Sequence, residues 1–153
     1  MLMPGTYSQL LLHIVFSTKG RTPWITPEVA DRLYKYMGGI VRAERGGMLG
    51  IGGIEDHVHL CIRWRPDGNV SDLMRTVKSR SSKWVHEEFS TLGAFAWQEG
   101  YSVFSVSKSN EDSVKNYIAG QAEHHATKGD FKAELLGFLN AHKIEFDEKY
   151  VFD

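Results

Sequence analysis

The chain has 153 residues, a length that suits one domain with a sizeable buried core. Hydrophobic residues make up 42% and charged residues 24%, and 18 Lys and Arg face 19 Asp and Glu for a formal net charge of −1. This composition indicates an ordinary globular protein and argues against a generally basic protein that coats long duplexes. A nucleic-acid role would therefore have to rest on a local basic patch or on bound metal.

Targeting and membrane signals are not found in the sequence. The longest apolar run, residues 10–16, is interrupted by His13 and is far shorter than the about 20 residues of a membrane span. The N-terminus lacks the basic start and apolar stretch of a secretory signal. The single cysteine, Cys61, rules out an intramolecular disulfide and fits a reducing compartment. We expect a cytoplasmic protein with no membrane segment, forming one domain over residues 1–153.

The apolar periodicity and the turn-forming residues predict the order strand, helix, strand, strand, helix, strand, then two helices. The predicted strands cover residues 8–18, 48–55, 57–64 and 95–106. The predicted helices begin at polar caps: Thr26 followed by Pro27, Asn69 or Ser71, Ser109 or Asn110, and Asp130. In the first helix the buried stripe is expected to be Val29, Leu33, Met37, Ile40 and Val41. An aromatic tail follows at residues 150–152.

The first six predicted elements match the split β-α-β arrangement of ferredoxin-like folds. We expect the α+β class, with an antiparallel sheet and helices on both of its faces. That fold hosts many functions, RNA-binding platforms among them, so it does not decide the activity.

The strand over residues 57–64 carries a pair of histidines. Because strand side chains alternate, His57, His59 and Cys61 share one face, and the apolar residues share the other. The two histidines are roughly 7 Å apart at the backbone, a spacing from which both imidazoles can reach one cation. The alternatives are two polar residues on a half-solvated strand, or a zinc site that adds Cys61.

The predicted helix after the last strand carries a stripe that changes from apolar to polar: Val114, Ile118, Gln121 and His125. Tyr117 lies one helical turn before Gln121. Such a stripe suits a helix that packs its first turns on the sheet and offers its later turns to a site. The alternative is that Tyr117 is an interface residue and Gln121 is exposed.

The histidine pair followed by Tyr117 and Gln121 resembles the single-tyrosine HUH transposases. These are the TnpA type, which moves small insertion sequences as single-stranded DNA, and the related tyrosine transposases associated with repetitive extragenic palindromes (REP). The resemblance spans nearly the whole chain in order, at residues 12–19, 78–84, 101–107, 117–121 and 145–150.

The resemblance implies a metal-dependent mechanism. In the family, two histidines and a polar residue on the tyrosine helix bind a divalent metal, here His57, His59 and Gln121. Mg²⁺ or Mn²⁺ is expected, and imidazole ligands favour Mn²⁺. The metal polarises the scissile phosphate while Tyr117 attacks phosphorus, which gives a 5′-phosphotyrosine link and a free 3′-hydroxyl. His124 and His125 are candidates for a general base.

The resemblance also implies the partners: single-stranded DNA with hairpin ends, and a second copy of the chain. In family dimers the tyrosine of one subunit faces the histidines of the other, and Gly120 would let the tyrosine helix move. Residues 73–86 include Lys and Arg but no Asp or Glu, and basic residues also follow the first predicted strand. DNA contacts are therefore expected from Lys19, Arg21, Arg75, Lys78, Arg80 and Lys83. The alternative is that these lysines and arginines form only a solvated face.

Three other functions remain open at this point. One is a domesticated HUH nuclease acting on chromosomal palindromic repeats, with the same chemistry. The second is a non-catalytic ferredoxin-like module that binds RNA or DNA. The third is a simple metallohydrolase that forms no protein–DNA link.

Overall fold

The structure, a computed structural model, describes residues 5–147. Its centre is a four-stranded antiparallel sheet in the order β2-β3-β1-β4. The strands are β1 Leu10–Ser17, β2 Gly47–Ile54, β3 His57–Trp64 and β4 Ser102–Val106. The helices are α1 Pro27–Ala43, α2 Val70–Glu88, α3 Glu111–Ala119, α4 Gln121–Lys128 and α5 Phe131–Ala141. The ferredoxin-like α+β prediction is confirmed. Short 3₁₀ turns lie at Lys19–Arg21, Ser90–Leu92 and Lys108–Asn110.

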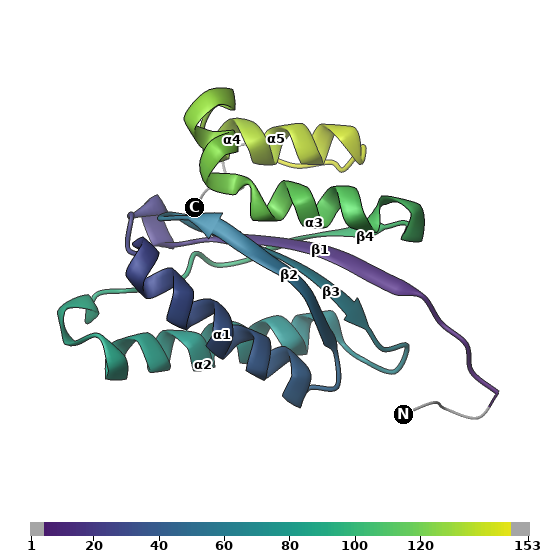
Figure 1. Ribbon diagram of the computed structural model, residues 1–153, viewed down its shortest axis with the longest axis horizontal. Coiled ribbons are helices and arrows are strands. Elements are labelled where there is room, and N and C mark those ends of the chain that lie inside the picture. Colours follow the sequence, from purple (N-terminus) through teal and green to yellow (C-terminus); the bar gives the residue numbers. More distant parts are fainter. Residues whose placement is uncertain (1–4, 148–153) are drawn as a thin grey trace.

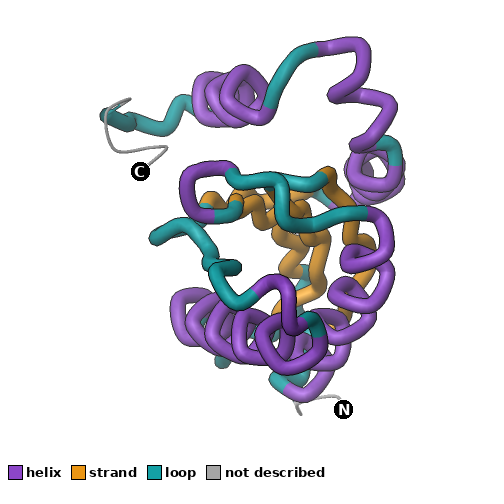
Figure 2. The backbone as a smooth tube through the Cα atoms, turned by 90° about the vertical axis from the view of Figure 1, so that its left-hand side faces the viewer, coloured by secondary structure: helices purple, strands orange, loops and turns teal. Residues whose placement is uncertain are grey.

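The sheet separates two helical layers (Figure 1). Helices α1 and α2 cover one face, and α3, α4 and α5 cover the other, as the end-on view also shows (Figure 2). The main core lies between the sheet and α1 and α2, because alternate residues of β1 and β3 point there. All five residues of the predicted α1 stripe are buried in this core. The opposite face of the same strands carries His13, His57 and His59 together with Val15.

On the opposite face a smaller apolar cluster fixes α5 to the sheet. Its buried residues are Val15, Phe104, Phe131, Leu135 and Leu139. The helix begins where the sequence predicts, since the side chain of Asp130 accepts a hydrogen bond from the backbone N–H of Ala133 at 3.0 Å. Cap and cluster together fix which side of α5 faces β3.

Helix α3 lies directly on β2 because this strand has glycines at the contact. Gly50 faces Lys115, and Gly52, which pairs with His59, faces Ile118. A Cβ atom on Gly52 would lie 2.3 Å from the carbonyl oxygen of Ile118. The missing side chain therefore lets the end of α3 approach the histidine strand.

The structure corrects two predicted elements. The predicted strand over residues 95–106 is shorter, since only Ser102–Val106 pairs continuously and Trp97 makes an isolated bridge to Thr18. The predicted tyrosine helix is two helices, because Gly120 leaves helical geometry at φ −93° and ψ 18°. Residues 150–152 lie outside the described part of the chain. Within residues 5–147 no helix is long and apolar enough to cross a membrane.

Candidate active site

The two histidines of β3 lie in the interior, under α3, α4 and α5. Both are 0% exposed, so the alternative of two polar residues on a half-solvated strand is wrong. The Nδ1 atom of His57 lies 2.7 Å from Oδ1 of Asp56, and Nδ1 of His59 lies 2.8 Å from Nε2 of His13. Such outer hydrogen bonds fix the ring orientation of a metal-binding histidine. The Nε2 atoms of both rings consequently face a common space.

Helices α3 and α4 bring Tyr117 and Gln121 to this space. Gln121 is only 1% exposed, and its Oε1 atom lies 3.0 Å from Nε2 of His57. The ring of Tyr117 is 5.8 Å from that of His59. The alternative of an exposed Gln121 is therefore wrong. The structure brings together, within one chain, all four residues that the sequence singled out: His57, His59, Tyr117 and Gln121.

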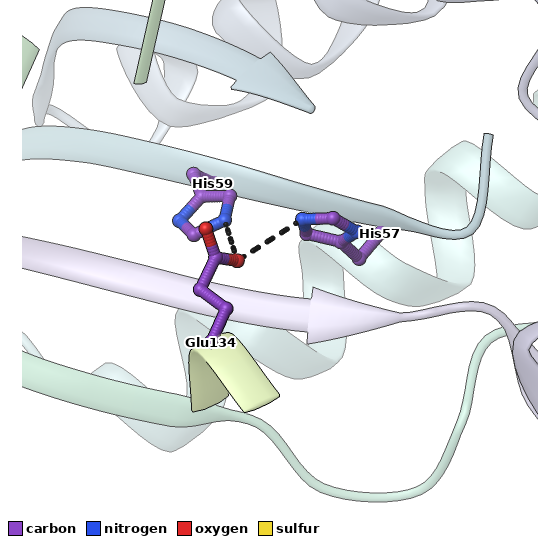
Figure 3. A group of neighbouring side chains, drawn as sticks. All are labelled: His57, His59 and Glu134. Atoms are coloured by element: carbon purple, nitrogen blue, oxygen red, sulfur yellow. Dashed lines mark hydrogen bonds and ion pairs between the residues drawn. The ribbon is translucent and has the colours of Figure 1, made fainter. Parts of the chain in front are cut away.

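Glu134 of α5, which the sequence reasoning missed, contacts both histidines (Figure 3). Its Oε1 atom is 2.8 Å from Nε2 of His59 and 3.2 Å from Nε2 of His57. Its Oε2 atom accepts hydrogen bonds from the Tyr117 hydroxyl and, at 3.0 Å, from Nε2 of Gln121. The side chain is 2% exposed. One feature of the sequence could have indicated Glu134: it is the one acidic residue in α5, and it borders the apolar stripe of that helix.

The charges of these groups depend on one another. Burial lowers the pKa of His57, but hydrogen bonds to Asp56 and Glu134 outweigh it and raise this pKa to about 9. For His59 burial dominates and the pKa is lowered. Burial would raise the pKa of Glu134, yet the hydrogen bonds from the two histidines hold it well below its usual range. The carboxylate is therefore ionised at neutral pH.

Two further groups are held in their neutral forms. Burial, followed by the effect of His59, lowers the pKa of His13 to about 3, so its ring can accept a hydrogen bond from His59 at pH 7. Burial and the hydrogen bond to Glu134 raise the pKa of Tyr117. His124, a candidate general base, has its Nε2 atom 3.4 Å from the Tyr117 hydroxyl. His125 instead contacts Oε1 of Gln121 at 3.0 Å.

The donor atoms suit a divalent cation. One nitrogen each of His57 and His59 and one oxygen of Glu134 all lie within 4.8 Å of one another. Bonds of about 2.1 Å at right angles put neighbouring ligand atoms about 3 Å apart, close to the separations seen here. This group can therefore hold a metal ion. Within residues 5–147 a second group of possible ligands consists of His124, His125 and Glu134. Cys61 belongs to neither group, so the structure does not support a zinc site that includes it.

The basic residues predicted to contact DNA fall into two sets. Lys19 and Arg21 are exposed in the turn after β1, at the end of the sheet where β3 begins, since Thr18 bonds to the carbonyl of Asp56. The other four lie on α2, in the layer opposite the histidines: Arg75, Lys78, Arg80 and Lys83. Among these, Lys78 donates to the carbonyls of Gln98 and Gly100, so its ammonium is engaged within the fold.

Comparison with known proteins agrees with this geometry. The family model described as IS200-like transposase matches residues 6–121. The chain belongs to this transposase family. The matched segment includes both histidines, Tyr117 and Gln121, whereas Glu134 lies beyond it. The single-tyrosine HUH resemblance is thus confirmed, and with it an enzyme of DNA transposition whose family uses a covalent tyrosine mechanism.

Individual relatives of this IS200-like transposase support the assignment. The ISDra2 transposase TnpA of Deinococcus radiodurans is 25% identical over 122 residues, covering 76% of this chain and 87% of the relative. The transposase of insertion sequence element IS200 from Salmonella typhimurium is 33% identical over 73 residues, which is 44% of this chain and 47% of the relative.

Two solved structures share the fold. A Deinococcus radiodurans crystal structure, described as that of a transposase, superposes with a TM-score of 0.66 at 25% identity, covering 79% of this chain and 97% of that one. A REP-associated tyrosine transposase bound to a REP hairpin gives a TM-score of 0.57 at 11% identity, covering 78% and 71%.

Proposed function

We propose that this transposase cleaves and rejoins single-stranded DNA with Tyr117 as the nucleophile and with a divalent ion held by His57, His59 and Gln121. The observation that carries the proposal is the convergence of these four side chains, with His57, His59 and Gln121 buried, although they come from three separate elements. Two imidazoles in the donor set favour Mn²⁺ over Mg²⁺. A DNA substrate and a single thiol suit the cytoplasm.

Tyr117 would act through its phenolic oxygen. The oxygen attacks the scissile phosphorus, the O–P bond of a 5′-phosphotyrosine forms, and the bond from phosphorus to the 3′-oxygen breaks to leave a 3′-hydroxyl. Nε2 of His124 lies 3.4 Å from the hydroxyl and can accept its proton, while Oε2 of Glu134 orients the hydroxyl. The departing 3′-oxygen takes its proton from solvent. A bound metal ion offsets the charge that builds on the phosphoryl oxygens. The later attack of another 3′-hydroxyl reverses the step and joins new ends.

We further propose that the reaction takes place within one subunit. Tyr117 hydrogen-bonds to Glu134, which contacts both histidines of the same chain. A homodimer and hairpin-ended DNA remain predictions from the family. If catalysis is in cis, mixing Tyr117→Phe with His59→Ala subunits restores no activity. Rescue in verified heterodimers would instead show that the tyrosine acts on its partner's site.

The nucleophile is tested with single-stranded DNA carrying the element's own end, incubated with Mn²⁺ or Mg²⁺ and analysed on a denaturing gel. We expect a protein–DNA adduct that is lost in Tyr117→Phe and with a chelator. Tyr36→Phe, in α1 on the opposite layer, is the matched control and should keep the adduct. Cleavage without an adduct would indicate a metallohydrolase, and binding with neither would indicate a non-catalytic module.

A further inference from the structure

We propose that Glu134 of α5 is a fourth protein ligand of the metal ion, joining His57, His59 and Gln121. The proposal rests on the function proposed above, since it assumes that the histidine pair binds a divalent cation. It adds a residue outside the segment that matches the family model, which ends at residue 121.

The first argument is the position of the donor atoms. Oε1 of Glu134 lies 2.8 Å from Nε2 of His59 and 3.2 Å from Nε2 of His57, and Oε1 of Gln121 lies 3.0 Å from the same His57 nitrogen. These separations are close to the about 3 Å between neighbouring ligands of an octahedral ion with bonds of about 2.1 Å. An octahedral ion held by four such donors would still have room for a phosphate oxygen and water.

The second argument is the free-energy cost of burying the Glu134 carboxylate. The side chain of Glu134 is 2% exposed, and a buried charge is strongly unfavourable unless it is paired or bound to a metal. Among the described residues its ion pairs are with histidines alone: His57, His59, His124 and His125. A divalent cation held by the carboxylate and the histidine pair would balance this charge in place of a protonated imidazole.

The third argument is how firmly α5 presents this side chain. Phe131 stacks on the ring of His57 with centroids 4.4 Å apart, and Phe138 packs edge-on against His13 at 5.0 Å. Glu134 lies between these two aromatic residues along the helix. The carboxylate is therefore aimed at the two imidazoles by packing on both sides, and its second oxygen accepts a hydrogen bond from the Tyr117 hydroxyl.

The test measures metal binding. Titration calorimetry should give a dissociation constant for Mn²⁺ that rises at least about 10-fold in Glu134→Gln, because even partners outside the ligand shell change affinity by about 10–100-fold. The EPR spectrum of bound Mn²⁺ should change, and the rise in Tm caused by Mn²⁺ should shrink. Glu145→Gln, at an exposed position, is the matched control and should bind as the wild type does.

His57→Ala separates this proposal from the underlying one. If Glu134→Gln binds Mn²⁺ as tightly as the wild type or more tightly, while His57→Ala loses it, then Glu134 only fills space near the site and the proposal is overturned. If His57→Ala also binds normally, the proposed metal site itself is wrong.

A labelling experiment covers the case in which Glu134→Gln does not fold. Wild-type protein made by cell-free synthesis with ¹³C-glutamate and unlabelled glutamine, then loaded with Mn²⁺, should show the strong ¹³C hyperfine coupling of a directly bound carboxylate. Absence of that coupling would overturn the proposal.

Discussion

The Nε2 atom of His13 in β1 lies 2.8 Å from Nδ1 of His59 in β3, and both rings are buried. The rings are stacked with centroids 5.0 Å apart. His13 is neutral at pH 7, because burial and His59 lower its pKa to about 3, so it can accept the Nδ1–H of His59. In the metal-free protein the proton of neutral His59 can lie on Nε2, which faces Glu134. With a cation bound, the hydrogen bond to His13 would keep that proton on Nδ1 and leave Nε2 available as a ligand.

Replacing His13 by Ala should therefore weaken metal binding about 10–100-fold without removing a ligand. His13→Gln keeps an acceptor for the Nδ1–H and should retain most of the affinity. Calorimetric titration with Mn²⁺ checks both variants. Equal losses in the two would point to a packing role, and no loss in either would contradict the orienting role.

Gly52→Ala should separate the tyrosine helix from the histidines. The added Cβ would lie 2.3 Å from the carbonyl oxygen of Ile118, and a backbone atom cannot rotate away. We expect a loss of about 1–3 kcal/mol in the free energy of unfolding together with a slower yield of the Tyr117–DNA adduct. Gly93→Ala is the control, since its Cβ would meet no atom within 4 Å. Unchanged adduct yield in Gly52→Ala would contradict this account of the helix contact.

The metal-free protein should lose stability as the pH rises from about 6.5 to about 9. Burial opposes the charged form of His57, but Asp56 and Glu134 raise its pKa from 6.5 to about 9. The folded protein then holds the proton more tightly than the unfolded chain. The stabilisation is complete below pH 6.5 and falls by at most about 1.4 kcal/mol per pH unit above it. The contribution is measured as the free energy of unfolding by urea, with a chelator present, at a series of pH values in wild type and His57→Gln. If the two plots of unfolding free energy against pH are parallel, the prediction is wrong.

Lys19 and Arg21 should contribute more to DNA binding at the site than the basic residues of α2. Replacing either by Ala should weaken binding of single-stranded DNA and reduce the slope of log affinity against log salt by about 1. Lys83→Ala, on α2 in the opposite layer, tests whether the DNA also reaches that helix. A comparable fall in the salt slope in this variant would show that it does. Lys78→Ala should mainly lower thermal stability, since its ammonium bonds to the carbonyls of Gln98 and Gly100.

The sequence predicted what depends on local patterns. Strand β3 has the bounds expected from its alternation, residues 57–64, and the stripe of α1 is buried as expected. The break at Gly120 was missed because helix propensity gives only a cost for glycine and does not say whether packing offsets it. Strand pairing and helix docking depend on contacts between residues far apart in the sequence, so local sequence patterns could not predict which side chains they bring together.

Glu134 and His13 show this limit most clearly. Glu134 is 75 residues from His59 in the sequence, and nothing near it indicates the contact. His13 was visible as the polar residue that interrupts an apolar strand, but its partner follows only from the pairing of β1 with β3. The histidine pair, Tyr117 and Gln121 could be found because their spacing resembles a known family.

The missing side chain of Gly52 also bears on how a transposase gene can lose its activity in a genome. Every amino-acid change open to a glycine codon adds atoms, and at this position any added atom meets the backbone of Ile118. One point mutation can therefore move the tyrosine away from the histidines while every motif residue stays in the gene. A decayed gene of this kind would then still read as an intact transposase, and its inactivity would be recorded in a strand that carries no catalytic residue.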